Sequence, residues 1–174
     1  MAGFEGERLS SEVLIRQTES VEDLQLVRRL FREYEAAIEV SLCFQSFEEE
    51  LANLPGEYAP PSGRLLLAYI EDQPVGCIAL RKKTETICEM KRLFLRPAAR
   101  GKHVGRRLVE TIINEACNIG YQRMRLDTMP GKMDKAIAMY RSVGFEEIPA
   151  YYDTPVGDTI FMELKLSPSG NGGS

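Results

Sequence analysis

A short glycine-containing segment, Arg100 to Gly105, holds the residues whose types and spacing most directly indicate chemistry. It reads Arg-Gly-Lys-His-Val-Gly, follows an apolar, strand-like run and leads into a helix-like run. The first N–H groups of a helix have no partner within it, and the helix dipole adds partial positive charge there. Lys102, Arg106 and Arg107 place basic side chains beside the loop. The segment therefore predicts a binding site for phosphate groups.

Two familiar nucleotide-binding loops do not fit this segment. A Walker A loop needs Gly-Lys followed by Ser or Thr, whereas His103 follows Lys102, and no glycine stands five positions before Gly101. A dinucleotide fingerprint needs three glycines that open the first helix of a parallel unit, and antiparallel strands are expected to come first here. The spacing alone also allows a tight turn before a solvated, basic helix start.

The distribution of charge favours a local anionic ligand. The chain has a formal net charge of -4, yet residues 61–110 contain 11 basic and 5 acidic side chains. A nucleic-acid-binding domain normally presents a broad basic surface, which the acidic remainder of this chain does not provide. We therefore expect no nucleic-acid partner and a small phosphate-bearing ligand at the basic segment.

The composition is that of an ordinary globular enzyme or binding module, with 174 residues, 44% of them apolar and 28% charged. The first 11 residues contain no apolar run, and no later stretch approaches the ~18 apolar residues of a membrane span, so we expect no membrane partner and a cytoplasmic location. Neither a disulfide framework nor a metal site is expected, because the cysteines are scattered without a Cys-x-x-Cys pair. They are Cys43, Cys77, Cys88 and Cys117.

Apolar periodicity predicts a mixed α/β fold that positions the loop. We expect strands at residues 12–17, 64–70, 75–81, 86–95, 124–126, 145–148 and 159–165. We expect helices at residues 20–38, 46–54, 104–119 and 132–142, the first two opened by capping boxes at Ser20 and Ser46. Residues 71–74 should form a hairpin turn, and the strand–helix–strand from Leu93 to Leu126 requires a parallel crossover. Residues 1–166 fit one domain, followed by a Gly/Ser tail at 167–174.

Three separated motifs resemble the GNAT superfamily of N-acetyltransferases. Its pyrophosphate loop, Arg/Gln-x-x-Gly-x-Gly/Ala, is matched by Arg100 and Gly105, with His103 in the place of the central glycine. Residues 90–97 resemble the family's fourth strand and its Val-x-Pro element, and residues 136–145 resemble Ala-x-x-Leu-Tyr-x-x-x-Gly-Phe. Met133 stands where many members have an asparagine that contacts the cofactor. The motifs span about residues 86–146, and the order of elements extends the likeness over residues 12–166.

This resemblance implies a central, twisted, mostly antiparallel sheet whose fourth and fifth strands form a parallel, splayed pair, flanked by helices. It implies acetyl-CoA as the co-substrate, lying at that splay. The backbone that would pair with the pantetheine arm belongs to Leu93, Phe94 and Leu95. The residues that would hold the pyrophosphate are Arg100, Gly101, Lys102, His103, Val104, Gly105 and Arg106. His103 is the only histidine, and we expect it to contact phosphate rather than to catalyse.

The resemblance also implies two catalytic side chains. Tyr140 lies where the family places a hydroxyl near the sulfur, so it would protonate the departing thiolate; the alternative is a core tyrosine on an amphipathic helix. Glu89 lies where some members hold the general base and would act directly or through water, and burial would raise its pKa. The alternative is a strand carboxylate paired with Lys91 or Arg81.

The expected function is direct transfer of an acetyl group from acetyl-CoA to the primary amine of a small molecule or amino-acid-like acceptor. The resemblance implies that the walls of the acceptor site come from the two early helices, their loop through Pro61, and the segment Tyr151 to Asp153. Acidic residues in the early helices fit either a cationic amine or an ordinary charged surface. The alternative function is a non-catalytic acyl-CoA-binding sensor or partner module, and a homodimer stays open.

Overall fold

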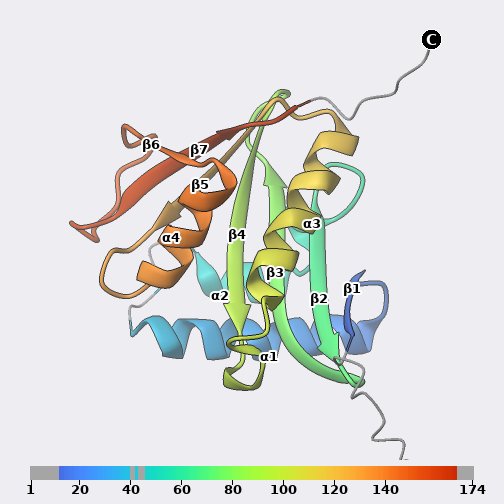
Figure 1. Cartoon of the computed structure of the whole chain (residues 1–174). Helices are drawn as coiled ribbons and strands as arrows, with labels where there is room; N and C mark the ends of the chain where they lie inside the picture. Colours follow the sequence, from blue (N-terminus) through green and yellow to red (C-terminus); the bar gives the residue numbers. More distant parts are fainter. Residues whose placement is uncertain (1–11, 40–41, 43–45, 168–174) are drawn as a thin grey trace, which may run out of the picture.

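Seven strands form one sheet in the order β1-β2-β3-β4-β5-β7-β6 (Figure 1). The computed structural model describes residues 12–39, 42 and 46–167. The strands are β1 (Val13–Gln17), β2 (Arg64–Ile70), β3 (Gln73–Lys82), β4 (Ile87–Leu95), β5 (Arg123–Thr128), β6 (Glu146–Ile148) and β7 (Ile160–Lys165). Every neighbouring pair is antiparallel except β4 and β5, which are parallel. The predicted mixed α/β fold with one parallel pair is therefore confirmed.

Helices cover both faces of the sheet (Figure 1). On one face lie α1 (Val21–Ile38) and α2 (Phe47–Ala52), which pack with β2 and β3 around a core that includes Phe31 and Leu67. On the other face lie α3 (Val104–Ile119) and α4 (Asp134–Val143), whose core includes Leu108 and Tyr140. Two 3-10 turns, η2 (Gly56–Tyr58) and η3 (Pro97–Ala99), complete the helical elements of the described residues. Within these residues, no helix has the length and apolar character needed to cross a membrane.

The helix starts and the hairpin turn were mostly predicted correctly from local sequence signals. At α1 the Ser20 side chain accepts from the Asp23 N–H, and the Asp23 carboxylate accepts from the Ser20 N–H, as a capping box requires. At α2 the predicted capping box is wrong, because Ser46 has a left-handed backbone (φ 56°) and its side chain makes no capping bond. The hairpin between β2 and β3 turns through Glu71 and Asp72 alone, both at positive φ, so it is tighter than the predicted link.

Strand β4 is the element that creates the space for a site. On its β3 side, Cys77 pairs with Phe94 and Ala79 pairs with Lys91, so the one β3 residue between them opposes two β4 residues. This is a β-bulge at Arg92, whose φ is 61°. On its β5 side, pairing covers only Ile87 to Glu89 and then stops. The two parallel strands therefore separate beyond Glu89, which is the splay predicted from the sequence.

Candidate active site

A cavity opens where β4 and β5 separate. Its walls come from residues 90–93 of β4, residues 126–129 at the end of β5, α1, α4 and the segment between β6 and β7. Tyr34 and Met133 belong to the core on the α1 side, whereas Leu126 and Tyr140 belong to the core on the α3 side. The cavity is therefore reached by side chains from both helical layers of the fold.

Tyr140 lies on α4 and lines this cavity, as expected of a residue that touches the reacting groups. Only 5% of its surface is exposed, and its ring packs edge-on against Phe145 with the centroids 5.7 Å apart. Burial, with Tyr34 and Asp127 nearby, raises the pKa of Tyr140 well above its ordinary value. The hydroxyl is therefore protonated at neutral pH, which is the form that an acid needs.

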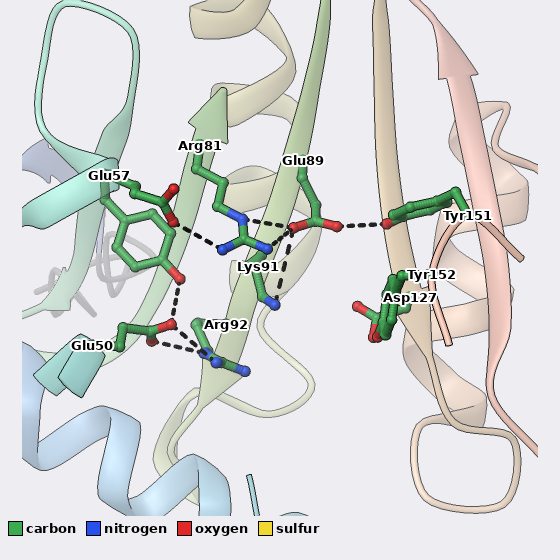
Figure 2. A network of polar contacts seen from close by, with 10 residues as sticks. Glu50, Glu57, Arg81, Glu89, Lys91, Arg92, Asp127, Tyr151 and Tyr152 are labelled. Carbon is green, nitrogen blue, oxygen red and sulfur yellow. Dashed lines mark hydrogen bonds and ion pairs between the residues drawn. The ribbon is translucent and has the colours of Figure 1, made fainter. Parts of the chain in front are cut away.

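Glu89 is fully buried on β4 and does not line the cavity. Arg81 donates to its Oε1 at 2.7 Å, and the Tyr151 hydroxyl donates to its Oε2 at 2.7 Å. The Lys91 ammonium lies 4.0 Å from the same Oε1, as Figure 2 shows. Both carboxylate oxygens are thus engaged, so the ion pairs weighed as the alternative to a base are present.

The expected upward shift in the pKa of Glu89 is wrong. Burial would raise this pKa, but the charges of Lys91 and Arg81 outweigh the burial, and the Tyr151 hydrogen bond adds to them. The pKa of Glu89 is therefore lowered, and the carboxylate stays ionised throughout the neutral range.

Sequence reasoning missed two other charged residues of the cavity, Arg92 and Asp127. Arg92 is almost completely buried and forms a two-pronged ion pair with Glu50 of α2, at 3.0 and 3.1 Å. Asp127 accepts a hydrogen bond from the Tyr152 hydroxyl. A usable signal was present in β4, where three charged residues interrupt an apolar strand, since buried charges are normally paired or functional.

Lys91 is the third charged residue of the cavity, and sequence analysis considered it only as an ion-pair partner. It is 8% exposed. Burial and repulsion by Arg92 lower its pKa to about 8, although Glu89 and Asp127 act in the opposite direction. The Lys91 ammonium therefore gives up its proton more readily than that of an exposed lysine.

The predicted phosphate loop has the backbone of an anion-binding site. Gly101 and His103 have left-handed conformations, with φ of 75° and 59°, and no side chain caps the start of α3. The first N–H groups of the helix, which belong to Val104, Gly105 and Arg106, have no partner inside it. Successive N–H groups in such turns form a concave nest for anions. His103 has the left-handed conformation that a glycine adopts without strain, and it lies exposed on the surface.

Gly105 lets α3 approach β4 closely. A Cβ atom at Gly105 would meet Leu95 Cδ1 at 3.1 Å, so a larger residue would require the Leu95 side chain to shift by a few tenths of an ångström. The exposed side chains of Arg100 and Lys102 lie beside the nest. The Arg106 guanidinium turns away instead, because it donates to Glu110 at 3.0 Å and to Ser142 at 2.9 Å; this leaves Arg106 its backbone N–H for the loop.

The three β4 residues expected beside the pantetheine arm lie past the point where pairing with β5 ends. Leu93 lines the cavity, while Phe94 packs edge-on against Tyr34 of α1 at 6.4 Å. Leu95 touches the α3 start, as described above. An unpaired strand edge offers N–H and C=O groups to an extended ligand, so this edge suits an amide-containing arm.

Neither metal nor thiol chemistry is supported by the part of the chain that the structure describes. In residues 12–39, 42 and 46–167, no three or more His, Cys, Asp and Glu side chains gather as a metal site would need. Cys88 is buried, and burial raises the pKa of its thiol to about 12, which disfavours the nucleophilic thiolate. Cys43 lies outside the described residues.

Comparisons with known proteins agree with this geometry. The model of the acetyltransferase (GNAT) family matches residues 24–145. An uncharacterized N-acetyltransferase of Schizosaccharomyces pombe is 35% identical over 159 residues, covering 90% of this chain and 97% of its own length. The IAA acetyltransferase of Azospirillum brasilense is 40% identical over 112 residues, covering 62% of this chain and 71% of its own.

Solved structures show the same fold. A GNAT-family acetyltransferase from Staphylococcus aureus Mu50 superposes with a TM-score of 0.74 at 19% identity, covering 90% of this chain and 100% of the other. The PaiA N-acetyltransferase of Thermoplasma acidophilum, solved with coenzyme A, gives a TM-score of 0.68 at 22% identity, covering 88% and 99%.

Proposed function

Since the chain belongs to the GNAT acetyltransferase family and is an acyl-CoA-dependent N-acetyltransferase, we propose that it transfers acetyl from acetyl-CoA to the primary amine of a small molecule. The observation that carries this proposal is the cavity between β4 and β5, which Tyr140 lines together with the charged residues Lys91 and Asp127. It joins the two helical layers, so a donor on one side can meet an acceptor on the other.

The donor would be held by backbone groups along two connected segments. The nest from Gly101 to Arg106 suits the pyrophosphate, and Arg100 and Lys102 add positive charge beside it. The unpaired edge of β4 from Leu93 to Leu95 suits the amide-containing arm. Acetyl-CoA supplies the acetyl group as a reactive thioester.

Transfer needs a bond exchange at one carbonyl carbon. The neutral amine nitrogen attacks that carbon, a C–N bond forms, and the C–S bond breaks with its electron pair remaining on sulfur. Tyr140 would donate its proton to the thiolate, and the proton released by the attacking amine would restore the hydroxyl; the raised pKa of Tyr140 keeps the hydroxyl protonated before transfer. The β4 bulge at Arg92 interrupts the regular pairing with β3, so a backbone N–H at this bulge would be the candidate to stabilise the developing oxyanion.

In this proposal, a water molecule takes the proton from the amine and passes it to Glu89. Direct contact does not fit, because Glu89 does not line the cavity and both its oxygens are bonded. Its lowered pKa keeps it ionised but makes it a weak base. We therefore expect the loss of Glu89 to reduce turnover by only about tenfold, less than the ~100-fold or more typical of a general base in direct contact.

The test is thiol release from acetyl-CoA in the presence of amino acids, polyamines, aminoglycosides and peptides, with the acetylated product identified by mass. Tyr140→Phe and Glu89→Gln are measured beside the native chain, and acetyl-CoA binding is measured separately. Acceptor-dependent release that falls in Tyr140→Phe supports the proposal. Acetyl-CoA binding without release for any acceptor would instead support an acyl-CoA-binding sensor.

A further inference from the structure

We propose that two adjacent tyrosines are positioning residues with separate tasks: Tyr152 orients Asp127 to bind the acceptor amine, and Tyr151 orients Glu89 for removal of the amine proton. The inference rests on the proposed function and adds to it the carboxylate that the amine contacts. Both tyrosines belong to the segment between β6 and β7. Thr154, Val156 and Thr159 of the same segment line the cavity.

The hydroxyls of the two tyrosines reach different strands. The Tyr151 hydroxyl donates to Glu89 Oε2 of β4 at 2.7 Å, and Figure 2 shows these two side chains pointing toward each other. The Tyr152 hydroxyl donates to Asp127 Oδ2 of β5. One short segment therefore holds a carboxylate on each of the two strands that separate at the cavity.

The two rings are held by packing, so their hydroxyls have fixed places. The buried Phe161 of β7 lies edge-on to both rings, with centroids 5.0 Å away, and the two rings are 5.5 Å apart. Arg125 and Lys83 lie over the Tyr151 ring at 5.2 and 5.6 Å. Burial raises the pKa of both phenols well above the ordinary value, so each stays a donor at neutral pH. A donor locked in this way orients the carboxylate that accepts from it.

The sign of its charge makes Asp127 the group that an amine meets. Asp127 is the one carboxylate among the described residues that line the cavity. The other charged side chains there, Lys91 and Arg92, are cations and repel an ammonium group. Tyr152 is a neutral donor, so its bond orients the Asp127 carboxylate without cancelling the negative charge. A protonated amine therefore gains a charge-assisted hydrogen bond at Asp127.

Glu89 has a different relation to the acceptor, because it does not line the cavity. Arg81 holds its Oε1 at 2.7 Å and Tyr151 holds its Oε2 at 2.7 Å, so together they fix the plane of the carboxylate. That plane decides which lone pairs face the water that carries the amine proton. Tyr152 should therefore affect acceptor binding, which is read in KM, whereas Tyr151 should affect turnover, which is read in kcat.

The experiment compares Tyr151→Phe with Tyr152→Phe, a matched pair in which each variant loses one hydroxyl and keeps its ring. The probe is whichever of the amino acids, polyamines, aminoglycosides and peptides has the highest kcat/KM with the native chain. Tyr152→Phe should raise KM for this acceptor about fivefold with kcat within about twofold, and Tyr151→Phe should lower kcat about fivefold with KM within about twofold. Thermal unfolding and KM for acetyl-CoA verify that both variants are folded.

Double variants test whether each tyrosine acts through its carboxylate. Asp127→Asn should raise KM for the acceptor by about 30-fold, because a neutral amide replaces the charged group. Tyr152→Phe should add no further rise in KM to Asp127→Asn, whereas Tyr151→Phe should keep its full effect on kcat there. In Glu89→Gln the pattern should be reversed, with Tyr151→Phe silent and Tyr152→Phe fully effective.

The remaining outcomes separate this inference from the proposed function. The same change of KM and kcat in both tyrosine variants would show that the hydroxyls only hold the segment in place, and this would overturn the inference while leaving the acetyltransferase assignment intact. An undiminished effect of Tyr152→Phe in the Asp127→Asn chain would overturn it as well. No transfer to any acceptor, with acetyl-CoA bound, would overturn both the inference and the small-amine acceptor.

Discussion

The cofactor loop and the acceptor side of the cavity are built by opposite means. The loop from Arg100 to Arg106 is contiguous and mostly exposed, and its backbone conformation makes the expected binding groups. The acceptor side contains Lys91 and Arg92 of β4, which are buried, and Asp127 of β5, and Arg92 is paired with Glu50 of α2. In the proposed sites, backbone conformation would therefore define where the donor binds, and compensated charge would define where the acceptor binds. Disturbing one kind of site should have different consequences from disturbing the other.

The largest expected effect is on stability, at the buried ion pair of the acceptor side. Arg92→Met should lower the free energy of unfolding by about 3 kcal/mol, because Glu50, whose side chain is only 15% exposed, would lose its ionic partner. Urea unfolding followed by circular dichroism measures this change. The double variant Arg92→Met with Glu50→Leu should recover part of the loss, since no uncompensated charge remains. Equal losses in both variants would mean that shape, not charge, holds this region.

A second expected effect concerns pH and Lys91. Its pKa is lowered to about 8 from the ordinary lysine value of 10.5, so the unfolded chain binds this proton more tightly than the folded one. The cost of the buried charge is therefore fully present below pH 8 and disappears as the pH rises toward 10.5. Between these limits the native chain should gain up to about 3 kcal/mol of unfolding free energy relative to Lys91→Met. A constant difference across this range would show that the pKa of Lys91 is not lowered in the folded chain.

A third expected effect lies where the two regions meet, at Tyr140. Tyr140→Phe should lower kcat by about 100-fold with little change in KM for acetyl-CoA, because the ring keeps its packing and only the proton donor is lost. Steady-state thiol release measures both constants. A rise in KM without a fall in kcat would make Tyr140 part of the binding wall rather than the acid.

The smallest expected effect is in the loop, at His103. His103→Gly keeps the left-handed backbone and removes only an exposed imidazole. We expect KM for acetyl-CoA to rise by no more than about fivefold, since an exposed charge contact is worth at most ~1 kcal/mol. A rise beyond about 30-fold would show that the side chain, not the backbone nest, holds the phosphates.

The same contrast explains what could be predicted from the sequence. The elements around the loop were predictable because apolar periodicity, Gly120 after α3 and the Ser20 cap are local signals. The Ser46 cap failed because the residue types were present but the backbone there is left-handed. The pairings of Arg92 with Glu50, and of Tyr152 with Asp127, join residues 42 and 25 positions apart. Such pairings depend on how the elements pack, which no local pattern specifies.

The cavity between β4 and β5 is lined from both helical layers, and this has a consequence for the order of events. Two substrates that approach from opposite faces of a sheet do not compete for one entrance. In the proposed reaction neither product would have to depart before the second substrate arrives, so both substrates would be bound to the chain at the same time. Initial rates measured against one substrate at several fixed levels of the other should then give intersecting, not parallel, reciprocal plots.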